Sequence, residues 1–243
     1  DYDVDGVTSL ALMNQVLRAY GADPECFLPL RMDEGYGLTP DGVTRCVEAL
    51  RPELLIALDC GTSSAAEIDG LRAQGIDVIV IDHHEAKDSP PACTALVNPK
   101  LGDSFHYFCT VGLVFKVAHA MLKRCAVPGF DLRECLDLVA LGTRSATVPL
   151  IGENRPLVKR GLLQLAHTKS IGLRTLLEVS GIRAPFNAQH IGFGLGPRLN
   201  AAGRLGTAEA ALQLLLTKDA ARARLLATEL DRQNRERRRV EDE

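Results

Sequence analysis

The chain has 243 residues, of which 46% are hydrophobic and 24% are charged, and its formal net charge is −3. These values predict a soluble globular protein with a sizeable core. The net charge is slightly negative, so it does not indicate a polyanionic partner. No apolar run approaches a membrane span and no basic leader opens the sequence, so we expect a cytoplasmic protein with no membrane association. The seven cysteines show no Cys-x-x-Cys spacing, which argues against a disulfide framework or a zinc site.

Acidic residues open the chain in the run Asp1–Gly6. Asp3 and Asp5 are two residues apart, so in extended backbone they would share one side. Gly6 would then let the chain turn sharply into a helix over Val7–Ala19. Because a first strand should precede this run, we expect the sequence to begin inside a motif.

Two short apolar runs rich in branched residues, Leu54–Leu58 and Val78–Ile81, predict strands that are buried on both faces. Helix-compatible segments surround them, as in a parallel sheet, and the second half has the Ala- and Leu-rich spacing of helices. The fold class is therefore α/β, a parallel sheet flanked by helices and followed by a mainly helical half. The expected helices after the first are Ala65–Gln74 and Val111–Arg124, and helical spacing dominates the segments Leu157–Leu177 and Ala208–Leu230.

Polar residues follow each predicted strand. Asp59 follows the first and His83 lies just beyond the second, and the carboxyl ends of parallel strands meet at one edge of a sheet. With Asp3 and Asp5 they form a set of oxygen and nitrogen ligands that favours Mn²⁺ or Mg²⁺ over structural zinc. Two such metals would activate a water and clamp phosphoryl oxygens. Taken singly, each acid is equally compatible with a turn or a helix cap.

Two further groups of residues surround these ligands. His84 could contact a phosphate or leaving group, Asp82 could orient an imidazole, and Asp1 is placed beside the ligands. The arginine-rich segment Arg222–Arg239 suits either a solvated helix face or a helix that faces nucleic acid.

Several motifs carry a resemblance to a known family. They are Asp1-Tyr2-Asp3-Val4-Asp5-Gly6-Val7-Thr8-Ser9, Leu58-Asp59-Cys60-Gly61-Thr62-Ser63 and Asp82-His83-His84. Together they resemble the first three motifs of the DHH phosphoesterases. Two more stretches resemble the RecJ-like single-strand-specific exonucleases within that family. They are Glu34-Gly35-Tyr36-Gly37-Leu38 and Gly196-Pro197-Arg198-Leu199-Asn200-Ala201-Ala202-Gly203-Arg204-Leu205.

The resemblance implies a nuclease with two Mn²⁺ or Mg²⁺ ions that removes nucleotides from the 5′ end of single-stranded DNA in repair and recombination. It implies that the metal ligands are Asp3, Asp5, Asp59 and His83. Asp59 would bridge the metals and act in catalysis with His84, which would contact the phosphate. Three residues would hold either the site or the substrate backbone, namely Arg198, Asn200 and Arg204.

The same resemblance divides the chain into three parts. Residues 1–150 would form the α/β metal-binding core with its first strand truncated, and residues 151–220 the helical remainder of the DHH domain. Residues 221–243 would begin a helix that connects to a second, absent domain.

The chain departs from the family pattern at Ala146. RecJ-like proteins typically read Gly-Thr-Val-Ala-Asp-Val-Val-Pro-Leu there, and that Asp is a metal ligand. This chain reads Gly142-Thr143-Arg144-Ser145-Ala146-Thr147-Val148-Pro149-Leu150. An alanine cannot coordinate a metal, so the second metal is in question. The alternatives are an inactive DHH relative that serves as a nucleic-acid-binding or scaffold module, and a phosphodiesterase for short oligonucleotides or cyclic dinucleotides.

Overall fold

The computed structural model describes residues 2–29, 34–86, 89–102, 105–205 and 208–241, without the side chains of residues 202–205 and 240–241. Its sheet has three parallel strands in the order β1 (Leu54–Leu58), β2 (Asp77–Ile81) and β3 (Ala95–Val97). Both strands predicted from apolar runs are therefore confirmed. The third strand has only three residues, which is too short for hydrophobic periodicity to reveal it.

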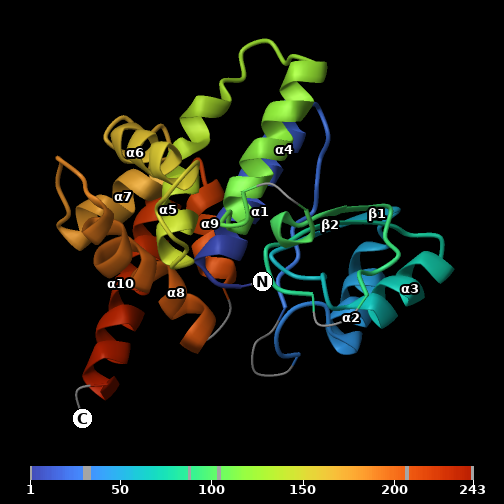
Figure 1. Ribbon diagram of the computed structural model, residues 1–243. Helices are drawn as coiled ribbons and strands as arrows, with labels where there is room; N and C mark the ends of the chain where they lie inside the picture. The colour runs from blue at the N-terminus through green and yellow to red at the C-terminus, as the bar shows by residue number, and fades with distance from the viewer. Residues whose placement is uncertain (1, 30–33, 87–88, 103–104, 206–207, 242–243) are drawn as a thin grey trace.

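Helices cover both faces of the sheet (Figure 1). On one face α2 (Pro40–Leu50) and α3 (Ala65–Ala73) enclose a small apolar cluster, while on the other α1 (Val4–Ala19) and α4 (Thr110–Arg124) join the sheet to the main core. Side chains alternate between these faces, as the two-residue period of a strand requires. Ala57, Val78 and Val80 belong to the small cluster, whereas Ile56, Leu58, Ile79 and Ile81 pack with the main core.

The second half of the chain is helical, as predicted. Its elements are α5 (Leu136–Ser145), α6 (Asn154–Leu165), α7 (Ile171–Ser180), a π-helical turn (His190–Leu195), α8 (Gly196–Leu205), α9 (Glu209–Leu216) and α10 (Ala220–Glu241). Two short 3₁₀ helices, Pro99–Leu101 and Leu132–Cys135, precede and follow α4 in the sequence. Each of the two segments with predicted helical spacing contains parts of two helices. Ser170 caps the start of α7 through its hydroxyl, and Thr217 ends α9 in extended backbone. No helix in the described ranges has the length and apolarity needed to cross a bilayer.

The start of α1 differs from the expectation. Asp3 is the N-cap, and its Oδ1 accepts a hydrogen bond from the Gly6 N–H at 3.0 Å. The helix therefore begins at Val4, and Asp5 lies in its first turn instead of on extended backbone. The expectation that Asp3 and Asp5 share one side of a strand is wrong. A carboxylate at the N-cap satisfies an amide that the helix leaves unpaired, and this favours an earlier helix start.

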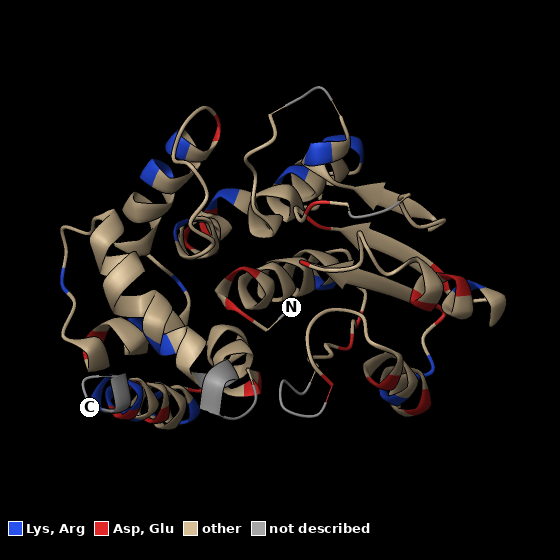
Figure 2. Cartoon of the chain, turned by 60° about the horizontal axis from the view of Figure 1, so that its bottom comes forward, with Lys and Arg blue, Asp and Glu red and all other residues tan. Residues whose placement is uncertain are grey.

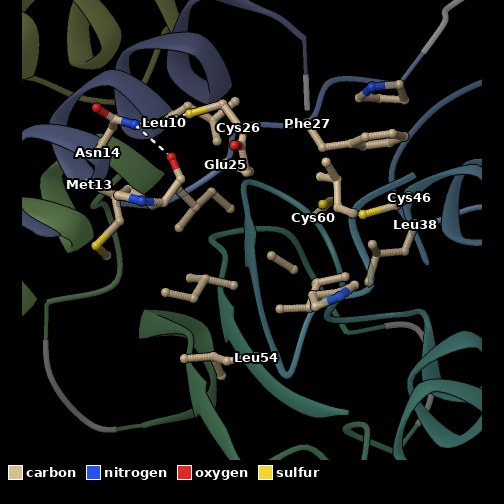
Figure 3. Close-up of a pocket in the computed structure, with 18 of the residues that line it drawn as sticks. Leu10, Met13, Asn14, Glu25, Cys26, Phe27, Leu38, Cys46, Leu54 and Cys60 are labelled. Atoms are coloured by element: carbon tan, nitrogen blue, oxygen red, sulfur yellow. Dashed lines mark hydrogen bonds between the residues drawn. The ribbon is translucent and has the colours of Figure 1, made fainter. Parts of the chain in front are cut away.

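The outer edge of β1 borders an apolar cavity of about 470 Å³. In the described residues β1 pairs with β2 alone, and Leu54 is 48% exposed along the open edge. Figure 3 shows Met13 and Asn14 of α1 on one side of this cavity and Cys46 and Leu54 on others. Most of its lining residues are apolar, although Asn14, Asp23 and Glu25 also line it.

The buried carboxyl of Asp137 leads to a stability prediction. Its Oδ2 accepts from the Thr168 hydroxyl at 2.6 Å and its Oδ1 from the Leu138 N–H at 2.7 Å. Burial nevertheless raises the pKa of Asp137 above the ordinary 3.8. The stability that this group contributes is therefore full below its unfolded pKa and is lost as the pH rises through the higher folded value.

Asp137→Asn should remove that loss. As the pH rises above about 4, we expect the free energy of unfolding to fall more steeply for the unsubstituted chain than for the variant, measured by denaturant unfolding. Asp69→Asn is the matched control, because Asp69 is exposed on α3. Parallel stability curves for Asp137→Asn and the unsubstituted chain would contradict the prediction.

Candidate metal centre

Four elements deliver polar side chains to the carboxyl-terminal edge of the sheet. The start of α1 supplies Asp3 and Asp5, the end of β1 supplies Asp59, and the loop after β2 supplies His83. The N-terminus of α4 closes the group from the opposite side with Thr110. The convergence inferred from the strand ends is therefore present in the fold, although helix starts provide half of it.

Asp5 lies at the centre of this group and is 1% exposed. Its two carboxylate oxygens accept from the backbone N–H groups of Thr110 and Val111, both at 2.8 Å. These amides open α4, where a helix end favours negative charge. Burial, with the charge of Asp3 added, outweighs the amides and raises the pKa of Asp5 to about 6. Asp5 is thus a carboxylate fixed in place but short of positive charge.

Asp59 follows β1 in left-handed backbone with φ of 65°, a conformation that costs a non-glycine residue on the order of 1 kcal/mol. Its N–H donates to the Ile81 carbonyl at 3.0 Å, and its Oδ1 accepts from the Thr110 hydroxyl at 2.7 Å. Burial and the neighbouring Asp5 raise the pKa of Asp59 well above its ordinary value. The fold therefore holds a strained, buried acid against a second acid.

His83 faces both acids. Its Nε2 lies 3.4 Å from Asp59 Oδ1 and 3.6 Å from Asp5 Oδ2. Burial, helped by the charge of His84, lowers the pKa of His83 to about 4, so at neutral pH the ring is uncharged. A neutral imidazole has a lone pair to offer a cation, and it leaves the carboxylates without a positive partner.

Asp82 organises the loop behind His83. Its Oδ1 accepts from the N–H groups of His83 and His84 at 2.8 and 3.1 Å and contacts Nδ1 of His84 at 2.7 Å, while its Oδ2 accepts from the Thr62 N–H at 3.1 Å. Burial alone would raise the pKa of Asp82, but the His84 and Thr62 contacts outweigh it and hold that pKa below its usual range. The carboxylate in turn raises the pKa of His84. The imidazole of His84 is thereby oriented while its side chain stays 53% exposed.

Sequence reasoning missed two residues that hold this arrangement. Thr110 contacts both central acids, through its N–H and its hydroxyl. Asn98, which follows β3, donates through Nδ2 to the Thr62 hydroxyl and to the His84 carbonyl, each at 2.9 Å. A polar residue after a third strand would have been the signal for Asn98, but that strand was not recognised. Thr110 gave no signal, because threonine at a helix start is common.

The remaining predicted residues have mixed positions. Arg198 donates to Asp231 and to the Gly194 carbonyl, each at 2.8 Å, and Asn200 Oδ1 accepts from the Val4 N–H at 3.0 Å. Both therefore connect α8 to its neighbours, and Asn200 reaches the residue next to Asp3. Asp1 and the side chain of Arg204 lie outside the described residues.

Ala146 ends α5 at its C-cap and is half-buried. Its N–H donates to the Gly142 carbonyl, one turn earlier on the same helix face. Gly142 in turn lies against the central acid, because a Cβ at that position would be 3.2 Å from Asp5 Oδ1. Position 146 is therefore on the side of α5 that faces the acidic group.

Gly142 leads to a prediction about the site. A Cβ there would overlap the Thr8 hydroxyl and lie 2.6 Å from Val111 Cγ1. We expect Gly142→Ala to displace Asp5 and to weaken Mn²⁺ binding about tenfold or more, measured by calorimetric titration. Gly70→Ala is the control, since a Cβ there meets nothing within 4 Å. Unchanged Mn²⁺ affinity in the Gly142 variant would contradict the role of this close contact.

The donor set suits a hard divalent cation. Ligand atoms of Asp59, His83 and His84 all come within 4.8 Å of one another, and Asp5 and Asp59 crowd together with pKa values raised by burial. Carboxylate oxygens with a neutral imidazole are ligands that Mn²⁺ and Mg²⁺ accept, and a cation would offset the repulsion between the acids. The chemistry such a group could support is activation of water beside a phosphate.

Comparison with known proteins identifies the family and several relatives of the chain. The family model described as "DHH family, N-terminal domain" matches residues 1–143. The single-stranded-DNA-specific exonuclease RecJ of Dickeya dadantii (strain 3937) is 41% identical, over 99% of this chain and 44% of the relative. RecJ of Thermus thermophilus is 40% identical, over 100% of this chain and 35% of the relative. The chain thus spans less than half the length of these relatives.

Two solved structures share the fold. A crystal structure of exonuclease RecJ bound to manganese superposes with a TM-score of 0.91 at 40% identity, covering 100% of this chain and 61% of that one. RecJ from Thermus thermophilus in complex with Mn²⁺ gives a TM-score of 0.86 at 38% identity, covering 100% of this chain and 35% of that one. The fold of the chain is therefore similar to that of proteins whose structures contain manganese.

Proposed function

This chain belongs to the DHH family, and from that membership we propose that it is the catalytic part of a metal-dependent, RecJ-like exonuclease in the cytoplasm. Its substrate would be single-stranded DNA, degraded from the 5′ end during repair and recombination. The observation that carries this proposal is the convergence of Asp5 and Asp59 on His83, whose Nε2 lies 3.6 Å and 3.4 Å from their carboxylate oxygens. The choice of substrate is supported by the name of the relatives, single-stranded-DNA-specific exonuclease RecJ. The choice of metal is supported by a similar solved structure that is bound to manganese.

We assign the metal-holding role to Asp3, Asp5, Asp59 and His83. When bound there, Mn²⁺ or Mg²⁺ would supply Lewis acidity, which lowers the pKa of a water and offsets phosphate charge. The Thr110 hydroxyl fixes Asp59 Oδ1, which lies 3.4 Å from His83 Nε2, so Asp59 and His83 would hold a cation together. Asp3 stays half-buried at the rim of the group, and its charge acts on both Asp5 and Asp59.

His84 is the residue that we assign to the phosphate or leaving group. Asp82 contacts its Nδ1 and favours the protonated ring, so the exposed Nε2 can present a proton outward. A proton held there can be donated to a developing alkoxide oxygen. Asn98 keeps the His84 carbonyl and the Thr62 loop together, which limits movement of the ring away from the acids.

Ala146 sets the level of activity that we propose, because it removes one carboxylate from this side of the site. The activity of the chain would be impaired, with one metal held more weakly than the other. The same observation favours a second function, that of an inactive DHH relative that binds nucleic acid or acts as a scaffold. The intact Asp5, Asp59 and His83 geometry counts against it.

A nuclease assay separates these two functions. A 3′-labelled single-stranded oligonucleotide should be shortened in the presence of Mn²⁺ and not in EDTA, and the duplex form should resist. A scaffold would bind the strand without shortening it. Calorimetric titration adds an independent measure, since a metal enzyme should bind Mn²⁺ at a defined stoichiometry and a scaffold should not.

A further inference from the structure

A polar pocket of about 180 Å³ lies beside the start of α1, where α5, the π-helical turn, α8 and α10 meet. Two cations line this pocket and no carboxylate does, although α10 carries both signs of charge along its length (Figure 2). Asn200 connects it with the acidic group, because its Oδ1 accepts from Val4 next to Asp3. The lining residues used below are Arg144, Ser145, Gly192, Asn200 and Arg237.

Arg144 is half-buried, and its guanidinium group lies close to Gly192. A Cβ at Gly192 would be 3.0 to 3.3 Å from three atoms of the guanidinium group. Arg144 has no hydrogen bond or ion pair with the part of the chain that the structure describes. Arg198 differs, since Asp231 neutralises it at 2.8 Å. A half-buried guanidinium without an acid has its planar fork of donors available to an anion.

Ser145 adds a hydroxyl to the same pocket. Its Oγ is buried and has no partner in the described structure, which is uncommon for a buried polar atom. Arg237 brings a second guanidinium from α10, and one of its nitrogens contacts Asn234 Oδ1 at a long 3.4 Å. Two guanidinium groups and one hydroxyl are hydrogen-bond donors of the kind that bind the oxygens of a phosphate group.

We propose that this pocket binds one backbone phosphate of the nucleic-acid strand, next to the linkage held at the metal centre. This proposal rests on the proposed function, because that function identifies the phosphate as part of single-stranded DNA. Arg144 stands where RecJ-like proteins typically have valine, so this contact would be particular to this chain. Arg144 and Arg237 share the phosphate charge, and Ser145 donates to one of its oxygens.

Fluorescence anisotropy of a labelled single-stranded oligothymidylate, measured in EDTA so that no cleavage occurs, tests the pocket. Arg144→Ala should weaken binding about tenfold, since charged hydrogen bonds are lost. It should also reduce the slope of log affinity against log salt by about 0.7, the value for one phosphate on a single strand. Arg160→Ala, which removes the same charge from an exposed site on α6, should change neither quantity.

A coupling measurement identifies the phosphate. Oligonucleotides that carry one neutral methylphosphonate at successive positions should show a single position where Arg144→Ala has no further effect. Arg144→Ala with Arg237→Ala should lower the salt slope no further than about 0.7, because both act on one phosphate. The proposal would be overturned if Arg144→Ala left the affinity for the oligonucleotide unchanged. It would also be overturned if Arg144→Ala lowered the affinity equally at every methylphosphonate position. Absence of binding by the unsubstituted chain would overturn it as well, whereas Mn²⁺-dependent degradation in a parallel assay would leave the proposed function standing.

Discussion

Ala146→Asp is expected to raise Mn²⁺-dependent degradation of single-stranded DNA by about 100-fold. Position 146 ends α5 one turn after Gly142, on the face that lies against Asp5. A carboxylate there would add an anionic ligand to a site that has two buried acids and a neutral imidazole, and would strengthen the binding of a second cation. The measurement is the initial rate of shortening of a 3′-labelled strand, with Mn²⁺ stoichiometry from calorimetry.

Ala166→Asp is the matched control for this gain. Ala166 is the C-cap of α6, so the change adds the same charge at the same place on another helix. Both variants should lose a few tenths of a kcal/mol to about 1 kcal/mol of stability, because an acid is unfavourable at a helix C-terminus. Only Ala146→Asp should bind more Mn²⁺ and cleave faster. Rates within twofold of the unsubstituted chain would instead support the scaffold function.

Asp59→Asn should weaken Mn²⁺ binding, whereas Ala146→Asp should strengthen it. It should also change the stability of the metal-free chain. Asp59 touches His83 Nε2 at 3.4 Å and is 2% exposed, so its loss removes the acid shared by the proposed ligands. We expect Mn²⁺ affinity to fall by 100-fold or more and strand degradation to become undetectable. Without metal the variant should be more stable by roughly 1–2 kcal/mol, because one of two crowded buried acids is gone.

The shape of the site should survive this substitution. Asparagine tolerates left-handed backbone at φ of 65°, and its Oδ1 can still accept from the Thr110 hydroxyl. Thermal unfolding with and without Mn²⁺ distinguishes the two effects. The variant should unfold at a higher temperature than the unsubstituted chain in EDTA and gain nothing from Mn²⁺. Asp69→Asn, on the exposed side of α3, should keep the full Mn²⁺ response, and a Mn²⁺ response retained by Asp59→Asn would refute its role as a ligand.

Local sequence determined the first two strands and the chemical type of the site. Leu54–Leu58 is apolar along its whole length and rich in branched residues, so it predicts a strand without tertiary information. Asp59 and His83 follow strands, and the rule that parallel strand ends meet brings them together. The resemblance added what single residues could not, namely that position 146 ordinarily carries an acid.

Long-range packing decided the rest. The N-terminus of α4 reaches Asp5 across more than 100 residues, and no pattern near Thr110 indicates which carboxylate its amide will meet. Asp5 itself belongs to a helix because Asp3 caps it, a choice between two local structures that the acidic run leaves open. Arg198 is neutralised by Asp231 from α10, whereas Arg144 meets no such acid in the described part of the chain. Apolar periodicity is set by neighbours in sequence, but the partner of a buried charge is set by whichever helix end or side chain the fold brings beside it, and that depends on the whole chain at once.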